Sequence, residues 1–294
     1  MIETYVVHVT RACNADCKYC YERDSDRTIK YSTEEIENYC STLLDNRTSN
    51  EFNIEFIGGE PMLAVENMIA AYNLIEEKAP HEVVNYFITT NGIYLPDKAL
   101  EFIQSDKRVK WAVSIDGNQF ANSLRVDKFG KNLLDRSLAS FKKLKEAGIQ
   151  DEQISVHLVT HPYNVYLLEN SISFLYEQGF RHIGVGVIEK TMEIGKEFSD
   201  RFIQEFSKVS KKIHNNELPD AHIDLLSHIK PRQDRRFYIR DKNGKLLGES
   251  YGRSGDDITN SNEFDPVEGR SNLTDFIPIL KEIVYYRHVE GIYD

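Results

Sequence analysis

The sequence predicts an α/β fold, a partial (β/α)6 TIM-like barrel with a C-terminal α+β extension. The main observation is that short β-rich runs alternate with helical patterns over the first two thirds of the 294 residues. Six such strand and helix units in series imply a parallel sheet with right-handed crossovers. After about residue 215 the alternation stops, so we assign residues 1–214 to the barrel and residues 215–294 to the extension.

Each expected strand is rich in β-branched or aromatic residues, and most of them end at a turn signal. The six strands are residues 4–10, 52–57, 83–90, 109–115, 154–160 and 182–187. In the fourth strand, small and polar residues alternate with apolar ones, which places Ser114 and Asp116 toward the lumen. In barrels and in open sheets, function sits at the C-terminal ends of the strands.

Helical patterns fill the gaps between these strands. The first begins at a capping box formed by Ser32 and Glu35 and carries its apolar residues on one face. The other five helices are residues 63–77, 97–104, 133–147, 167–178 and 196–213. In the extension, Asn243-Gly244 between two apolar runs predicts a β-hairpin, and residues 273–286 form a last helical pattern that contains Pro278.

Charge and hydropathy exclude several classes of protein. The 36 Lys and Arg residues against 47 Asp and Glu residues give a net charge of -11, which argues against a broad basic surface for nucleic acid or an anionic membrane. No apolar run approaches the roughly 18 residues of a membrane span, and the first residues lack the pattern of a signal peptide. We therefore expect a cytoplasmic protein with no nucleic-acid or membrane partner.

The strongest chemical signal is a group of three cysteines directly after the first strand. Cys13, Cys17 and Cys20 have the spacing C-x3-C-x2-C, which is too close for a disulfide framework and typical of metal ligation in a reducing compartment. A structural zinc site or a fully protein-ligated [4Fe–4S] cluster needs four ligands, so three cysteines leave one iron open. Cys40 lies mid-helix on an apolar face, which favours a buried structural thiol over a ligand or a hydrogen-atom donor.

This triplet, with the aromatic Tyr19 before its last cysteine, resembles the radical S-adenosylmethionine enzymes. In that family the amino and carboxylate groups of S-adenosylmethionine chelate the open iron. One electron from the cluster then cleaves the cofactor to a 5′-deoxyadenosyl radical. The resemblance covers about residues 1–190. It implies two cofactors, one [4Fe–4S] cluster and S-adenosylmethionine, and a flavodoxin or ferredoxin as the electron donor.

Two turns after later strands support the resemblance. The run Gly58, Gly59, Glu60, Pro61 resembles the GGEP motif of the family, whose carboxylate lies near the ammonium group of the cofactor. By itself this run is a plain strand-to-helix turn with proline at the first helical position. The segment around Asn91, Thr-Thr-Asn-Gly, resembles the TNG turn of the family and is otherwise an ordinary glycine turn.

The end of the fourth strand, Ser-Ile-Asp-Gly, is similar to a segment of the anaerobic sulfatase-maturating enzymes and related peptide maturases. There the serine and an arginine about a dozen residues further on contact the cofactor. The similarity implies this role for Ser114 and Arg125, with Asp116 beside them. A lone arginine in such a loop is otherwise a solvated charge. Family analogy also places Val187, at the exit of the sixth strand, over the adenine.

The similarity to these SPASM-type maturases is incomplete. Many members continue into a cysteine-rich C-terminal domain, named SPASM or twitch, that binds auxiliary clusters, but this chain has no cysteine after Cys40. The hairpin at residues 237–253 looks like the hairpin of that domain with its cysteine replaced. A single cluster must therefore suffice for the chemistry. Because the first strand begins almost at Met1, no leader-peptide-binding domain is expected before it.

The resulting hypothesis is a radical S-adenosylmethionine enzyme that abstracts hydrogen from a peptide or protein. The alternative is an enzyme of the same family that acts on a small molecule such as a nucleotide or a cofactor precursor. A more distant alternative is a non-enzymatic zinc or iron–sulfur module, for which Cys40 or a histidine would supply the fourth ligand. The sequence leaves the bond that is made or broken open.

Overall fold

The structure, a computed structural model, describes residues 3–23, 25–47, 49–188, 191, 192 and 194–225, and the backbone of residues 235–240 and 246–250. Within this part nine strands form one sheet in the order β7-β6-β5-β4-β3-β2-β1-β8-β9. The strands are β1 (Glu3–Thr10), β2 (Phe52–Gly58), β3 (Val83–Thr90), β4 (Val109–Ser114), β5 (Ile154–Thr160), β6 (His182–Val187), β7 (His222–Leu225), β8 (Arg235–Arg240) and β9 (Leu246–Ser250).

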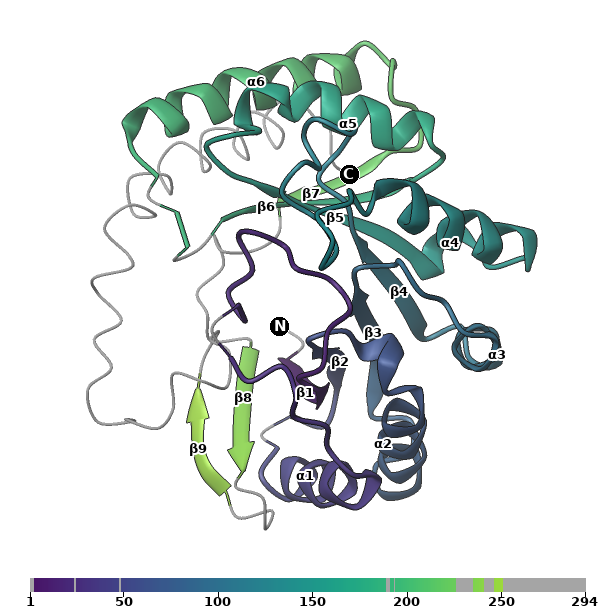
Figure 1. The fold of residues 1–294 in the computed structure, drawn as a ribbon. Coiled ribbons are helices and arrows are strands. Elements are labelled where there is room, and N and C mark those ends of the chain that lie inside the picture. Colours follow the sequence, from purple (N-terminus) through teal and green to yellow (C-terminus); the bar gives the residue numbers. More distant parts are fainter. Residues whose placement is uncertain are drawn as a thin grey trace.

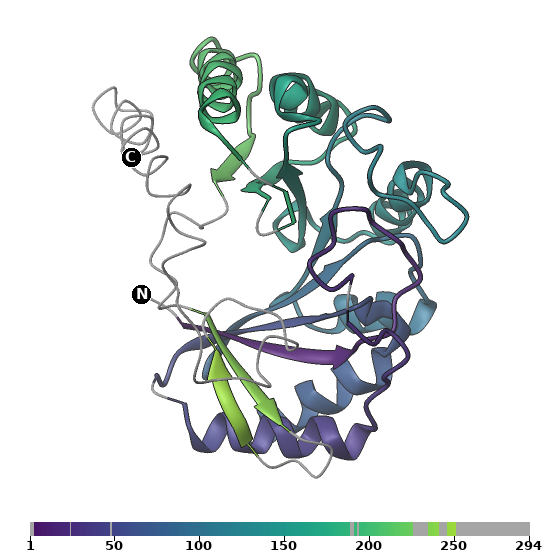
Figure 2. The ribbon, with the colours of Figure 1, turned by 60° about the vertical axis from the view of Figure 1, so that its left-hand side comes forward.

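The strands from β7 to β8 are all parallel to their neighbours, and β8 and β9 pair antiparallel. Six helices follow the strands in turn: α1 (Thr33–Asp45), α2 (Val65–Lys78), α3 (Asp97–Ser105), α4 (Leu134–Glu146), α5 (Leu168–Glu177) and α6 (Lys196–His214). The sheet curls into an open arc with these helices on its outer side (Figures 1 and 2). This arrangement confirms the predicted α/β partial barrel.

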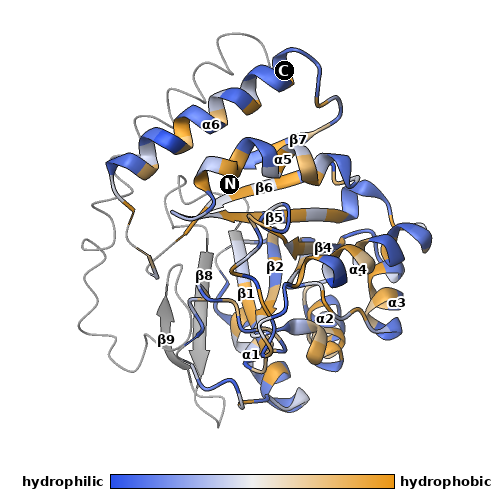
Figure 3. Ribbon diagram, turned by 45° about the horizontal axis from the view of Figure 1, so that its top comes forward, coloured by the Kyte–Doolittle hydropathy of each residue, from blue (hydrophilic) through white to orange (hydrophobic). Residues whose placement is uncertain are grey.

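The hydrophobic core lies between the sheet and the helices. Alternate strand residues point outward into it, among them Tyr5, Phe52 and Trp111, which are fully buried. The helices turn apolar residues toward the sheet and polar ones outward (Figure 3). Full burial of each large apolar side chain contributes roughly 1.5–3 kcal/mol, so this layer is the main source of stability. In the described residues, no helix is long and apolar enough to span a membrane.

The predicted strands and helices match the observed ones to within a few residues. The helix expected from residue 63 begins at Val65 because Pro61–Leu63 forms a separate 3-10 turn. The short strand β7 was not predicted, because its alternation of polar and apolar residues lasts for only four residues. It extends the parallel sheet beyond residue 214. The position of the domain boundary stays a prediction.

The pairing of β8 with β9 confirms the predicted hairpin. Its placement was not predicted: β8 lies beside β1 and runs parallel to it, with Thr4 opposite Arg235. The hairpin therefore extends the sheet on the side opposite to β7. The turn residues Asn243 and Gly244 and the helix expected at residues 273–286 lie outside the described residues.

Candidate active site

The three cysteines lie on the loop that connects β1 to α1. This cysteine loop, residues 11–31, crosses the inner side of the arc (Figure 2). Cys17 is buried and Cys13 and Cys20 are half-buried, and all three pack in one small apolar group with Ala15 and Leu133. Cys40 is in the main core instead. The structure thus brings together the three cysteines that the spacing singled out.

The loop that follows β4 holds the cysteine loop through its backbone. The amide of Asp16 donates to the carbonyl of Val126 at 2.7 Å, and the amide of Lys18 donates to the carbonyl of Leu124 at 2.9 Å. These bonds form a short antiparallel pairing between two loops that are over a hundred residues apart in the sequence. Satisfying buried backbone groups in this way fixes the loop without a helix or strand.

The backbone at the start of the cysteine loop passes so close to residues 58 and 59 that only glycine fits at these two positions. A Cβ on Gly58 would lie 2.1 Å from the carbonyl oxygen of Thr10, and one on Gly59 would lie 2.3 Å from that of Arg11. The close approach allows the amide of Gly59 to donate to Thr10 at 2.9 Å. The glycines therefore serve the packing of one strand end against another. Contact of this pair with the cofactor stays a prediction.

Glu60 lies at the junction of β2 and β3, where its carboxylate accepts three hydrogen bonds. The donors are the amide of Met62 at 3.0 Å, the amide of Asn91 at 2.8 Å and the hydroxyl of Thr90. Burial raises the pKa of Glu60 to about 7, against the opposing effect of these donors. The side chain is only 1% exposed. In this structure it joins the turns after β2 and β3, and its predicted role beside the cofactor is untested.

Asn91 connects the turn after β3 to the cysteine loop. Its amide nitrogen donates to Oδ1 of Asn14 at 2.8 Å and lies 3.9 Å from Sγ of Cys13. Its Oδ1 accepts the amide of Ile93 at 3.0 Å, which fixes the orientation of the side chain. Asn91 is thus beside a predicted cluster ligand, and its own contact with the cofactor stays a prediction.

Tyr19, Asp116 and Arg125 form a buried polar group under the cysteine loop. The hydroxyl of Tyr19 donates to Oδ2 of Asp116 at 2.5 Å, and Nη1 of Arg125 donates to the same hydroxyl at 2.6 Å. Nη1 of Arg125 lies 3.8 Å from Oδ1 of Asp116. Burial raises the pKa of Tyr19 well above its usual value, so the phenol stays protonated. Arg125 is therefore a buried, partnered side chain and not a solvated charge.

His161, which the sequence analysis missed, packs against this group. Its ring centroid lies 5.3 Å from that of Tyr19, and its Nδ1 accepts the amide of Tyr163 at 3.2 Å. This acceptor role places the remaining ring proton on Nε2, which is buried and has no hydrogen-bond partner. Burial, reinforced by Arg125, lowers the pKa of His161 to about 4. Its position directly after β5 was the available signal.

Two other predicted residues lie at the ends of β4 and β6. Ser114 is half-buried at the end of β4, opposite His157 of β5. Val187 ends β6 opposite Thr160. Their predicted contacts with the cofactor stay predictions. Cys40 is fully buried on α1, and burial raises its pKa to about 12. This location is that of a structural thiol, and its role as a hydrogen donor is untested.

The donor set of the loop, three thiols in one apolar group, is of the kind that holds an iron–sulfur cluster. Within the described residues, no three His, Cys, Asp or Glu side chains converge as one metal ion requires. The three thiols nevertheless share one apolar group, as the ligands of a larger cluster do. Burial raises the pKa of Cys13 to about 11, and the nearby charge of Arg27 acts in the opposite direction. A bound cluster would hold these thiols as thiolates.

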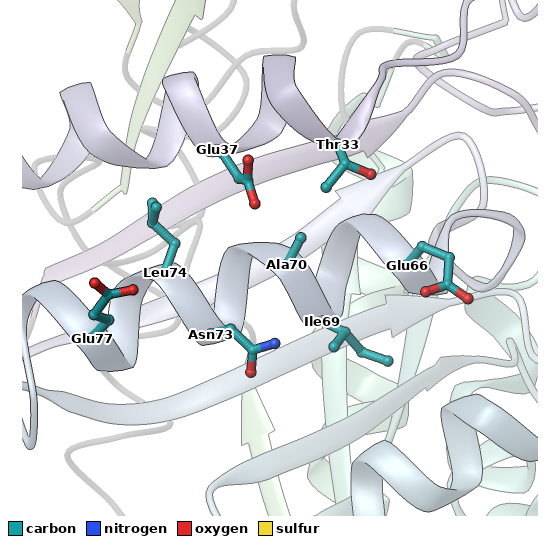
Figure 4. A pocket seen from close by; sticks show the side chains of 8 residues that line it. All are labelled: Thr33, Glu37, Glu66, Ile69, Ala70, Asn73, Leu74 and Glu77. Atoms are coloured by element: carbon teal, nitrogen blue, oxygen red, sulfur yellow. The ribbon is translucent and has the colours of Figure 1, made fainter.

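A separate hollow lies on the outer surface between α1 and α2 (Figure 4). Three glutamates, Glu37, Glu66 and Glu77, are among its lining residues. Both helices pack on the outer side of the sheet, away from the strand ends that carry the cysteine loop. None of the predicted site residues lines this hollow.

Comparison with known protein families identifies the superfamily to which the chain belongs. Residues 7–175 match the sequence profile of the Radical SAM superfamily, which is more than half of the chain. The chain belongs to the radical SAM superfamily. Its cofactors are accordingly a [4Fe–4S] cluster and S-adenosylmethionine, as the cysteine spacing predicted, and it is a radical SAM enzyme.

Two of three relatives of this radical SAM chain carry named activities, and these two activities differ. An uncharacterized protein of Methanocaldococcus jannaschii is 25% identical over 209 residues, 71% of this chain and 70% of that protein. An S-adenosylmethionine-dependent nucleotide dehydratase of Fibrobacter is 29% identical over 159 residues, 49% of this chain and 42% of that protein. A probable dual-specificity RNA methyltransferase RlmN of Fervidobacterium nodosum is 24% identical over 136 residues, which are 46% of this chain and 39% of that protein. The chain thus spans less than half of two of these relatives.

Solved structures share the fold. The structure of anSMEcpe with bound AdoMet and Cp18Cys peptide superimposes with a TM-score of 0.61 at 19% identity, over 76% of this chain and 63% of that chain. The SuiB structure from Streptococcus suis bound to precursor peptide SuiA superimposes with a TM-score of 0.59 at 15% identity, over 76% of this chain and 49% of that chain. Identities this low establish the common fold, and they carry no assignment of substrate.

Proposed function

We propose that this radical SAM enzyme holds its cluster through Cys13, Cys17 and Cys20 and abstracts hydrogen from a peptide or protein substrate. The observation that carries the first part is the meeting of the cysteine loop with the ends of β2, β3 and β4. The amide of Glu60, the side chain of Asn91 and the loop after β4 each hydrogen bond to it. Such a junction holds three thiols at one edge of the sheet, where α/β barrels place their sites.

The bound cluster and S-adenosylmethionine supply one electron and a carbon-centred radical. The residues of the chain hold and shield these groups. Arg125 holds the cysteine loop through its hydrogen bond to the hydroxyl of Tyr19. The carboxylate of Asp116 offsets the positive charge of the buried Arg125 guanidinium. The buried Nε2–H of His161 offers a neutral donor at this site because the low pKa of the ring keeps it uncharged at physiological pH. A dry, preorganised site protects a reactive radical from side reactions.

The charge on the inner face of the sheet supports a peptide over a nucleotide. The strand residues that alternate with the core-facing ones point inward. Along β1–β7, as far as the structure describes them, these positions carry one cation, Lys110, and two carboxylates, Glu55 and Asp224. A nucleoside triphosphate carries several negative charges and is bound by several Lys or Arg side chains.

The small-molecule alternative rests on the nucleotide dehydratase relative. The two substrate classes are separated by an anaerobic assay of the loaded enzyme. Candidate peptides encoded beside its gene are compared with nucleoside triphosphates for stimulation of 5′-deoxyadenosine formation and for a change in substrate mass. We expect stimulation and a mass change with a peptide alone. If a nucleotide changes mass and the peptides do not, the peptide assignment is contradicted. The assignment of radical chemistry would be unaffected.

A further inference from the structure

Large apolar side chains are exposed at one end of the barrel. Among the described residues, every large apolar side chain that is exposed lies on a connection between a strand and the helix that follows it, at the C-terminal ends of β1–β5. Single exposed apolar residues are ordinary on a protein surface. Their gathering at the end of the sheet that carries the cysteine loop marks a binding surface.

Three of these residues lie on two connections that pack together. Phe120, on the connection from β4 to α4, is 80% exposed, and Tyr163 and Tyr166, on the connection from β5 to α5, are 64% and 54% exposed. Nδ2 of Asn118 donates to Oδ1 of Asn170 in the first turn of α5 at 2.8 Å, which holds the two connections side by side. We call Phe120, Tyr163 and Tyr166 the aromatic surface.

The turn that carries Tyr163 is fixed by hydrogen bonds. Its amide donates to Nδ1 of His161 at 3.2 Å. Oδ1 of Asn164 accepts the amide of His161 at 2.7 Å, and Nδ2 of Asn164 donates to the carbonyl of Val159 at 2.9 Å. An exposed ring on a turn that is already ordered loses little conformational entropy when a partner covers it.

The aromatic surface begins at the candidate active site. The ring centroid of Tyr163 lies 6.2 Å from that of His161, which lies 5.3 Å from that of Tyr19. Tyr19 directly precedes Cys20 in the cysteine loop. An extended ligand can therefore enter the site with one part and cover the aromatic surface with the next.

The segments around these aromatic residues carry no acidic or basic charge. Residues 117–124, GNQFANSL, and residues 161–167, HPYNVYL, contain no Lys, Arg, Asp or Glu. Binding to a membrane surface or to nucleic acid uses cations beside aromatic groups, so these segments do not have the composition for either. Aromatic residues among Asn, Ser and Gly are typical of surfaces that bind peptides and proteins. There the rings supply contact area and the small polar groups supply hydrogen bonds.

We propose that the aromatic surface docks the segment of the substrate peptide beside the modified residue, and that this segment carries large apolar side chains. The proposal rests on the proposed function and deepens it, because it names the side chains that the peptide presents. Burial of apolar side chains against Phe120, Tyr163 and Tyr166 supplies binding energy outside the place of the reaction. That energy holds the residue to be modified in the site next to the cysteine loop.

The test selects peptides that bind the anaerobically reconstituted enzyme from a phage library of random sequences of about 12 residues. The most enriched sequence is synthesised with a fluorescent label, and its affinity is measured by fluorescence anisotropy. The triple variant Phe120→Ser, Tyr163→Ser and Tyr166→Ser is compared with a control variant, Leu63→Ser with Tyr94→Ser. The control residues are 44% and 48% exposed on the connections after β2 and β3. Because all five side chains are exposed, both variants should keep the iron content and the thermal midpoint of the wild type.

We expect the enriched peptides to carry Phe, Tyr, Leu or Ile at neighbouring positions. The affinity of the triple variant for the selected peptide should be lower than that of the wild type by about 10-fold or more. The wild type should lose as much affinity when serine replaces the apolar residues of the peptide, and the control variant should bind like the wild type. Equal affinity in the triple variant, or selection of peptides without apolar residues, would overturn the proposal.

The same variants separate two other occupants of the aromatic surface. If the wild type binds phosphatidylcholine vesicles and the triple variant does not, with unchanged peptide affinity, the surface binds a membrane. If the wild type sediments as a dimer and the triple variant as a monomer, again with unchanged peptide affinity, the surface joins two copies of the chain. Either result would overturn the proposal. The proposed function is decided separately, by the mass of the candidate peptides in the anaerobic assay.

Discussion

The chain buries its cysteines in two different surroundings. Cys40 is 0% exposed on α1, beside Ile36, Leu43 and Leu44 on the face that packs against the sheet. Cys17 is 9% exposed on a loop without regular structure, which is held by backbone hydrogen bonds to a second loop. Burial raises the pKa of both thiols. Arg125 and Arg27 act on Cys17 in the opposite direction, whereas Glu37 raises the pKa of Cys40 further.

The difference shows that burial alone does not mark a functional thiol. Helix α1 needs an apolar side chain at position 40, and a thiol meets that need as a small hydrophobic group. The cysteine loop has little apolar packing of its own, so polar contacts from β2, β3 and β4 must hold it. A thiol that is buried among cations and fixed polar groups is the one poised to bind a cluster. The two regions should therefore respond differently to substitution.

The largest effect is expected where the cysteine loop meets β2. In Gly59→Ala the new methyl group would lie 2.3 Å from the carbonyl oxygen of Arg11 and 2.5 Å from that of Ala12, so the backbone must move. We expect a loss of about 3 kcal/mol or more and greatly reduced iron incorporation. Thermal unfolding and iron analysis measure both. Gly195→Ala, which has open space and an ordinary φ, is the control and should lose about 1 kcal/mol at most, because residue 195 is the N-cap of α6, where glycine is preferred to alanine. Full iron incorporation in Gly59→Ala would contradict the packing role.

The next effect concerns the buried polar group below the loop. Asp116→Asn removes the negative charge that faces Arg125, and an uncompensated buried cation costs about 3–5 kcal/mol. Denaturant unfolding should show this loss. Glu146→Gln, which breaks the exposed Lys142–Glu146 pair, should leave the midpoint unchanged. Equal midpoints for the two variants would mean that Arg125 is not held by this contact.

A pH effect should follow from His161. Its pKa is about 4 in the folded chain and near 6.5 when unfolded, so the unfolded state binds more protons between these values. The free energy of unfolding should therefore fall as the pH drops from about 6.5 to about 4, by up to about 3 kcal/mol from this residue. Glu60, with its raised pKa, contributes in the opposite direction in this range. Comparing the wild type with His161→Asn isolates the histidine. Parallel pH profiles would contradict its neutral, buried state.

The smallest effect is expected in the core of α1. Cys40→Ala removes one buried sulfur and should lower the free energy of unfolding by about 1 kcal/mol, with iron content and 5′-deoxyadenosine formation unchanged. Calorimetric unfolding and iron analysis measure these quantities. A variant that folds normally but forms no 5′-deoxyadenosine would make Cys40 a participant in the reaction and remove the contrast with the cysteine loop.

The sequence predicted the parts of the molecule that depend on local patterns. Alternation along β4 placed Trp111 in the core correctly, and the spacing of Cys13, Cys17 and Cys20 identified the family. Contacts made over long sequence distances were not predictable. Tyr19 and Asp116 are 97 residues apart, and no local sequence pattern predicts the hydrogen bond between them. For the same reason β8 could not be placed beside β1. His161 was missed although its position directly after β5 was a signal.

The central claim is that the cysteine loop, and not Cys40, holds the cluster. It is tested most directly by anaerobic reconstitution with iron and sulfide, followed by reduction with S-adenosylmethionine and chromatography for 5′-deoxyadenosine. For the wild type and Cys40→Ala we predict about four irons with sulfide per chain and turnover of the cofactor, and for Cys17→Ala the loss of both. Full iron content and turnover in Cys17→Ala, or stoichiometric zinc in place of iron in the wild type, would contradict the claim.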